Sequence, residues 1–188
     1  MDWVPKKSLR RQPLAGTARF LTFSCYRRLR LFDNPRIKDH FVGVLQATLS
    51  THQVSLLAWV IMPNHVHLVV YPEDAEAIGP FLRTLKRPFA RTLLDRWRAC
   101  DASILPRLRD RSGQTHVWQP GGGYDRNVVA HELVEKIAYV HRNPVRDGLT
   151  PDGPSWKWSS AAAYAGRENA FGPPIAFDLI PSTEADLY

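Results

Sequence analysis

Residues 54–71 (VSLLAWVIMPNHVHLVVY) contain two strongly apolar segments on either side of a short turn. The first segment, residues 54–61, is almost continuously apolar, which is typical of a strand that is buried on both faces. Met62-Pro63-Asn64 predicts a turn. The second segment, residues 65–71, resumes as a strand, so the stretch predicts a hairpin-like pair of strands within a sheet.

Two histidines, His65 and His67, occupy alternate positions of the second strand. Side chains at i and i+2 project from the same face, so both imidazoles point one way, while Val66, Leu68 and Val70 point into the other layer. Two imidazoles on one rigid surface are a good start on a divalent-metal site. An isolated His-x-His motif is more often a pair of exposed histidines. A polar pair at the centre of a sheet, however, needs a partner or a role.

Three amphipathic helices are predicted by apolar residues at helical spacing. The first covers residues 35–50 and begins with an Asn-Pro capping signal. The second covers residues 75–97, and Pro88 should kink or interrupt it. The third covers residues 129–143 and should end at Pro144.

Two further strands complete the pattern. Residues 18–26 (ARFLTFSCY) are rich in β-branched and aromatic side chains, and residues 115–119 (THVWQ) predict a shorter strand between a loop and a glycine-rich turn. The order β-α-β-β-α-β-α predicts an α+β fold, a ferredoxin-like antiparallel sheet with helices packed on one face and an added C-terminal helix. We expect one domain over residues 18–150, a basic leader over 1–17 and a tail over 151–188.

The chain is basic, with 25 Lys and Arg against 18 Asp and Glu and a formal net charge of +7. This balance favours a polyanionic partner such as nucleic acid, although charge alone is equally compatible with a basic protein that has none. Two basic sets are candidate phosphate contacts, one in the leader and one on the polar face of the second helix. They are Lys6, Lys7, Arg10 and Arg11, and Arg83, Lys86, Arg87 and Arg91. The basic residues of the second set could equally form an ordinary solvent-exposed face of the helix, and this alternative is almost as good as DNA binding.

The apolar runs and the cysteines indicate in which cellular compartment we expect the protein. No run approaches the roughly 18 residues of a membrane span, and the N-terminal segment lacks the apolar stretch of a signal peptide. We therefore expect a cytoplasmic protein that does not contact membranes. Cys25 and Cys100 should both be reduced, and neither has a partner at metal-ligand spacing.

The third helix carries Tyr139 and Asn143, which lie next to one another as an i,i+4 pair. Both lie away from the centre of the apolar arc of this helix, whereas a structural tyrosine usually belongs to that arc. An exposed surface tyrosine remains an alternative. The amide oxygen of Asn143 is a possible third metal ligand beside the two histidines.

These motifs make the chain resemble the HUH-type single-tyrosine transposases, and most closely the REP-associated tyrosine transposases. The matching segments are MPNHVHLVV, FLRTLKRPFARTLL, WQPGGGYDRNV, AYVHRNPVRDGL and WKWSSAAAY, which follow the order of the family. The resemblance as a whole extends over roughly residues 22–164. The His-hydrophobic-His motif alone is weak, but the ordered set is specific. Pro88 departs from the ordinary helix former expected there.

The resemblance implies a metal-dependent enzyme that nicks and joins single-stranded, hairpin-containing DNA. It makes His65 and His67 ligands of Mg²⁺ or Mn²⁺, with Asn143 completing the protein's ligand set, and it makes Tyr139 the nucleophile of a 5′-phosphotyrosine intermediate. Family members act as monomers or as homodimers, and both states stay open here. Two alternatives also stay open: a catalytically idle DNA-hairpin-binding protein, and a metal phosphoesterase that uses water.

Overall fold

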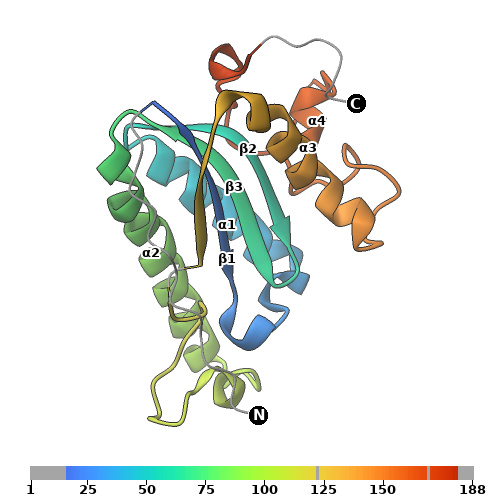
Figure 1. Ribbon diagram of the computed structural model, residues 1–188. Helices are drawn as coiled ribbons and strands as arrows, with labels where there is room; N and C mark the ends of the chain where they lie inside the picture. The colour runs from blue at the N-terminus through green and yellow to red at the C-terminus, as the bar shows by residue number, and fades with distance from the viewer. Residues whose placement is uncertain (1–15, 122, 169, 182–188) are drawn as a thin grey trace, which may run out of the picture.

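The computed structural model describes residues 16–121, 123–168 and 170–181, and one antiparallel sheet organises them (Figure 1). The strand order is β2-β3-β1-β4. The strands are β1 (Ala18–Ser24), β2 (Val54–Met62), β3 (His65–Pro72) and β4 (Tyr124–Val128). The α-helices are α1 (Pro35–Leu49), α2 (Ile78–Ala99), α3 (Ala130–Arg146) and the short α4 (Ala161–Tyr164). The expected order of elements and the ferredoxin-like α+β fold are confirmed.

The two faces of the sheet are covered by different helices. Leu21 and Leu68 pack with α1 and α2, whereas Phe20 and Val69, their neighbours in the chain, pack with α3. This alternation follows from the two-residue period of a strand. Figure 1 shows α3 on the other side of the sheet from α1. The strand that carries the histidines, β3, lies between β1 and β2, so its predicted central position is confirmed.

Two predicted helix interruptions are wrong. Helix α2 runs without a break from Ile78 to Ala99 with Pro88 inside it, and α3 continues past Pro144 to Arg146. A proline removes one main-chain hydrogen bond, but burial of the apolar face holds each helix together. In α2, for example, Phe81 is fully buried and Phe89 is only 1% exposed.

The predicted fourth strand is also wrong. Residues 115–119 contribute only isolated bridges, such as Cys25 to Trp118, and β4 is formed by Tyr124–Val128 instead. The segment YDRNV contains Asp, Arg and Asn, of which Asp and Asn are depleted in strands. Its extended conformation is set by antiparallel pairing with β1, in which Ala18 faces Val128 and Thr22 faces Tyr124.

The residues after α3 cover the outer edge of β2. Ile61 N donates to Trp158 O at 2.9 Å, Ser160 N donates to Trp59 O at 3.0 Å, and Ala176 N donates to Leu56 O at 3.0 Å. These hydrogen bonds explain how β2 remains buried although it ends the sheet. Of the described residues after 150, those near Trp158, Ser160 and Ala176 thus pair with the edge of β2.

Other expectations concern thiols and membranes. Cys25 is buried, Cys100 is exposed, and both are free thiols as predicted. Among the described helices, none combines the length and the apolar character required to cross a membrane.

Candidate active site

The two predicted histidines meet on the face of the sheet that α3 covers. Their Nε2 atoms are 3.0 Å apart and their rings are nearly perpendicular, at 86°. His65 Nδ1 lies 2.6 Å from Asn64 Oδ1, and His67 Nδ1 lies 2.7 Å from Thr22 Oγ1. An amide oxygen only accepts hydrogen bonds, so His65 Nδ1 is the donor and a neutral His65 carries its lone pair on Nε2, the atom that faces His67 Nε2.

Both histidines are neutral at physiological pH. Burial, followed by the nearby Arg28 cation, lowers the pKa of His65 to about 4. Burial, followed by the neighbouring His65, lowers the pKa of His67 to about 3. Neutral imidazole is the form that binds metal ions, so the environment keeps both rings ready to act as ligands.

The spacing of the two Nε2 atoms fits a shared divalent ion. Two nitrogen ligands about 2.1 Å from one ion and at a right angle to each other would be roughly 3 Å apart, and the observed separation is 3.0 Å. The described residues contain no cluster of three or more His, Cys, Asp or Glu side chains suited to a metal. Amide, water or phosphate oxygens would therefore complete the coordination.

Helix α3 brings Tyr139 to this pair. The ring centroids of His67 and Tyr139 are 5.7 Å apart at an angle of 74°. Phe20 holds both rings, since it stacks on His67 at 5.4 Å and meets the edge of Tyr139 at 5.9 Å. Tyr139 is half-buried. The structure thus places the predicted nucleophile beside one of the predicted ligands.

Asn143 lies one helical turn beyond Tyr139 and is buried. Its Nδ2 donates to Tyr139 O at 2.7 Å, and its Oδ1 accepts from Arg146 Nη2 at 2.8 Å. The predicted proximity of Tyr139 and Asn143 is therefore present. The amide oxygen faces Arg146 in this structure, and its ligation of a metal stays a prediction.

Two arginines near the site were not among the predicted site residues. Arg146 lies beside Tyr139, with its Cζ 5.4 Å from the ring centroid, and the neighbouring Tyr139 side chain raises the pKa of the Arg146 guanidinium. The cation of Arg28 acts on both histidines. Arg28 follows Arg27, and both have positive φ, 56° and 50°, which is uncommon for residues other than glycine. The Arg27-Arg28 pair after the first strand can be read from the sequence. The direction in which these two side chains leave the backbone, however, depends on this turn.

The predicted DNA-contact residues of α2 lie away from the histidines. Arg83, Arg87 and Arg91 are exposed on α2, which packs on the face opposite the histidines. Lys86 differs from them, because its ammonium lies 5.2 Å from the ring centroid of Phe23 and burial lowers its pKa. Lys6, Lys7, Arg10 and Arg11 lie outside the described residues.

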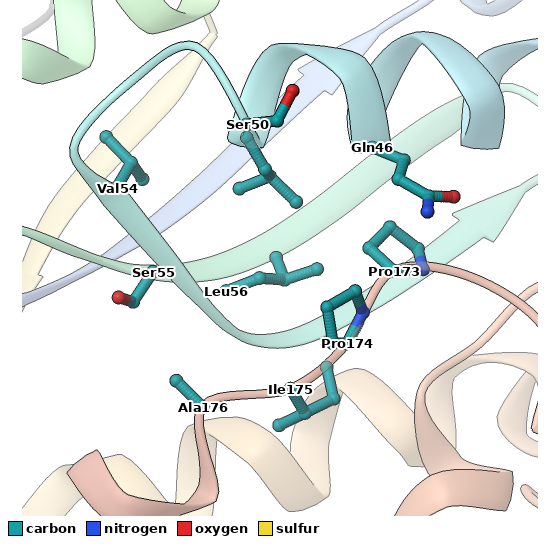
Figure 2. Close-up of a pocket in the computed structure, with 10 residues that line it drawn as sticks. Gln46, Ser50, Val54, Ser55, Leu56, Pro173, Pro174, Ile175 and Ala176 are labelled. Carbon is teal, nitrogen blue, oxygen red and sulfur yellow. The ribbon is translucent and has the colours of Figure 1, made fainter.

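A pocket of about 420 Å³ lies at the other end of β2 (Figure 2). It is lined by Leu56 and by the proline pair Pro173 and Pro174, among others. Residues of this part of β2 pair with the end of β3, whereas Met62 pairs with His65. The pocket is therefore separate from the histidine pair.

Comparisons with known proteins give the family and the fold of the chain. A family model described as "Transposase IS200 like" matches residues 17–143, more than half of the chain. A solved structure of a REP-associated tyrosine transposase bound to a REP hairpin is similar, with a TM-score of 0.63 and 19% identity over 95% of this chain and 96% of that chain. A candidate transposase from Deinococcus radiodurans R1 has a TM-score of 0.45 and 20% identity over 69% of this chain and 92% of that chain. No curated protein matches. The first structural likeness shows the fold.

Proposed function

Because the chain belongs to the IS200-like transposase family, we propose that it is a metal-dependent endonuclease and strand transferase for hairpin-containing single-stranded DNA. The observation that carries the proposal is the contact between Tyr139 on α3 and His67 on β3, with ring centroids 5.7 Å apart. Cleavage of a phosphodiester by a tyrosine requires a phenol as the nucleophile and, close to it, ligands for a metal ion. Tyr139 and the two neutral imidazoles would supply these groups.

His65, His67 and Asn143 would hold Mg²⁺ or Mn²⁺. When bound, the ion would orient the scissile phosphate and offset the charge that develops on its oxygens. The chain's own contribution is the phenol. The guanidinium of Arg146, whose Cζ lies 5.4 Å from the Tyr139 ring centroid, would stabilise the negative charge that develops on the phenol oxygen.

Tyr139 Oη would attack phosphorus while the bond from phosphorus to the 3′ oxygen breaks. The phenol proton is lost and the leaving 3′ oxygen gains one, which leaves a 5′-phosphotyrosine and a free 3′-hydroxyl. Attack by the 3′-hydroxyl of a second strand would reverse these bond changes and free Tyr139. Because the phosphotyrosine keeps the bond energy, joining needs no external energy source.

Several observations support DNA as the substrate. The net charge of +7 attracts a phosphate backbone, and the solved structure with the same fold is of a transposase bound to a REP hairpin. A tyrosine on a helix reaches the phosphate of an unpaired strand more readily than one in a duplex.

The test is covalent capture of a labelled hairpin oligonucleotide with an unpaired flank in the presence of Mn²⁺. The wild-type protein should form an adduct that survives a denaturing gel, and Tyr139→Phe should form none. Tyr71→Phe is the matched control, because Tyr71 is a half-buried tyrosine of β3 whose ring packs on the same side of the sheet. It should retain the adduct.

The same experiment separates the alternatives. A catalytically idle hairpin-binding protein would retain the oligonucleotide on a native gel and form no adduct. A phosphoesterase that uses water would still cleave after Tyr139→Phe. Either result would overturn the proposal.

A further inference from the structure

The exposed aromatic side chain of Tyr124 lies in line with the histidine site. Tyr124 begins β4 and is 53% exposed. Thr22 on β1 faces His67 on β3 and, on its other side, Tyr124 on β4. Side chains of directly paired residues project from the same face of a sheet. His67, Thr22 and Tyr124 therefore form one row across three adjacent strands, which Figure 1 shows side by side.

The position of Tyr124 in this row sets its distance from His67. Neighbouring strands are about 4.8 Å apart, so two strand spacings place Tyr124 roughly 10 Å from His67 along the sheet. The hydrogen bond between Thr22 Oγ1 and His67 Nδ1, at 2.7 Å, shows that the middle residue points to the histidine side. If a DNA strand binds with one phosphate at the histidines, a nucleotide close to that phosphate can therefore reach Tyr124.

Gly123 positions the backbone of Tyr124. Its φ is +102°, and a Cβ at this position would overlap the main-chain oxygen of Thr22. Only glycine allows the chain to approach β1 so closely at this point. The Tyr124 ring also meets Phe20 edge-on at 6.0 Å, and Phe20 stacks on His67. The Tyr124 ring is thus in contact with Phe20 of the site itself, while about half of the residue stays exposed.

We propose that Tyr124 is a stacking platform for a nucleobase adjacent to the scissile phosphate. A single exposed aromatic residue is common on protein surfaces, so exposure alone does not carry this inference; the shared row and the support from Phe20 do. Stacking is tolerant of base identity, so Tyr124 would hold the strand in register without selecting a sequence. The inference rests on the proposed function, because it takes the histidine pair as the place of the phosphate.

The experiment uses the Tyr139→Phe protein, which cannot react, and hairpin oligonucleotides in which 2-aminopurine replaces one unpaired base at a time. The adduct formed by the wild-type protein first locates the scissile phosphate. Stacking on Tyr124 should quench 2-aminopurine fluorescence at a base next to that phosphate. Adding Tyr124→Ala should abolish this quenching and weaken DNA binding by roughly 5- to 150-fold, whereas Tyr124→Trp should preserve both.

Phe177→Ala is the matched control, since Phe177 is 48% exposed and its ring packs on Tyr164. It should leave affinity and quenching unchanged. The inference is overturned if the protein with both Tyr139→Phe and Tyr124→Ala has the same DNA affinity, and the same 2-aminopurine quenching at every position, as the protein with Tyr139→Phe alone. Failure of the proposed function looks different, because the wild-type protein would then form no adduct whatever residue 124 is.

Discussion

Thr22 holds the ring of His67 through the 2.7 Å contact between Oγ1 and Nδ1. Asn64 does the same for His65 at 2.6 Å. Partners on the second ring nitrogen fix the tautomer and the direction of a metal-binding imidazole. At the scale of single residues, each of the two histidines proposed as ligands therefore has a neighbouring side chain that orients its ring.

Replacing Thr22 with valine should weaken Mn²⁺ binding about 10- to 100-fold, the usual cost of losing such an orienting partner. Valine keeps the shape of the side chain and removes only the hydroxyl. Isothermal titration with Mn²⁺ measures the effect. Thr48→Val is the control, because the Thr48 side chain is buried but its hydroxyl donates to Val44 O within α1, away from the histidines. Equal Mn²⁺ affinities for Thr22→Val and the wild-type protein would contradict the assignment.

Arg28 and Arg146 show that charges around the site come from different parts of the chain. Arg28 lies in the turn after β1, and Arg146 is the last residue of α3. Both cations lower the pKa of His65 and His67, although burial is the larger cause. The same positive charges would attract a phosphate group.

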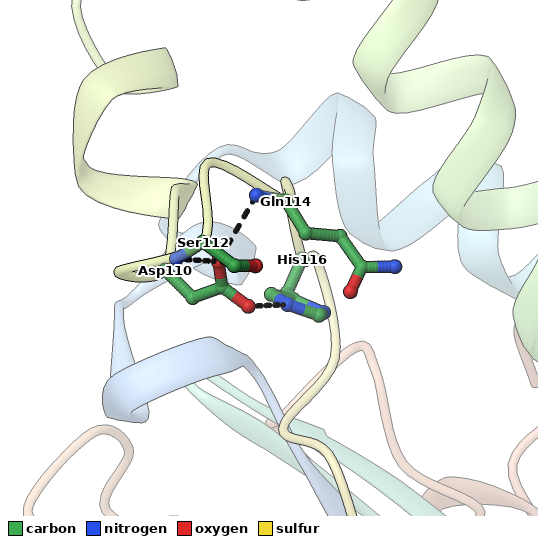
Figure 3. Close-up of polar contacts among 4 residues, drawn as sticks. All are labelled: Asp110, Ser112, Gln114 and His116. Atoms are coloured by element: carbon green, nitrogen blue, oxygen red, sulfur yellow. Dashed lines mark hydrogen bonds and ion pairs between the residues drawn. The ribbon is translucent and has the colours of Figure 1, made fainter.

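At the scale of elements, the loop before β4 supports the turn that carries Arg28. Asp110 Oδ1 accepts hydrogen bonds from Ser112 N at 2.9 Å and Gln114 N at 3.0 Å, and Oδ2 lies 2.7 Å from His116 Nε2 (Figure 3). The His116 ring packs on Tyr26, with centroids 5.2 Å apart. The carboxylate therefore orders a loop that packs on the residue two positions before Arg28.

Hydrogen bonds from Ser112 and His116 lower the pKa of Asp110 well below its usual value. The stabilisation from this carboxylate is therefore present above its unfolded pKa of about 4 and is lost as the pH falls towards the lowered folded pKa. Asp110→Asn should lower the Tm at neutral pH, and this difference from the wild-type protein should shrink as the pH falls below about 4. Calorimetry across this range measures both effects.

Asp178→Asn is the control for this prediction, because Asp178 is an exposed carboxylate in the C-terminal segment. It should have little effect on the Tm. A Tm difference between Asp110→Asn and the wild-type protein that does not vary with pH would show that the carboxylate charge is not responsible.

At the scale of the whole molecule, described residues that follow α3 connect the sheet edge to α3. Ser160 is 2% exposed, its Oγ accepts from Trp59 N at 2.9 Å, and it lies 2.8 Å from His141 Nε2. Trp59 belongs to β2 and His141 to α3. One hydroxyl thus links three segments that are far apart in the sequence.

Ser160→Ala should lower the free energy of unfolding by roughly 1–3 kcal/mol, because it leaves buried polar groups without their partner. Urea unfolding measures the change, and an unaltered m-value would show that the amount of surface exposed on unfolding is the same. Ser155→Ala should have a smaller effect, since the Ser155 hydroxyl bonds Asp152 at the surface. If both variants unfold alike, the buried link does not contribute as proposed.

The sequence by itself determined the features that depend on local periodicity. Alternation placed His65 and His67 on one face of a strand, and helical spacing placed Tyr139 beside Asn143. The order of helices and strands followed from the same patterns, and with it the fold class. Each of these relations involves residues only a few positions apart, so the backbone geometry of a single element is enough to predict it.

Only the tertiary structure decided which distant residues meet. Strand β4 exists because it pairs with β1, Thr22 touches His67 because of the register between β1 and β3, and Ser160 is buried because its segment covers β2. Pairing energies between strands depend on partners about 40 to 100 positions away, which local propensity does not contain. The meeting of Tyr139 with His67 is of the same kind, since packing of α3 on the sheet sets it.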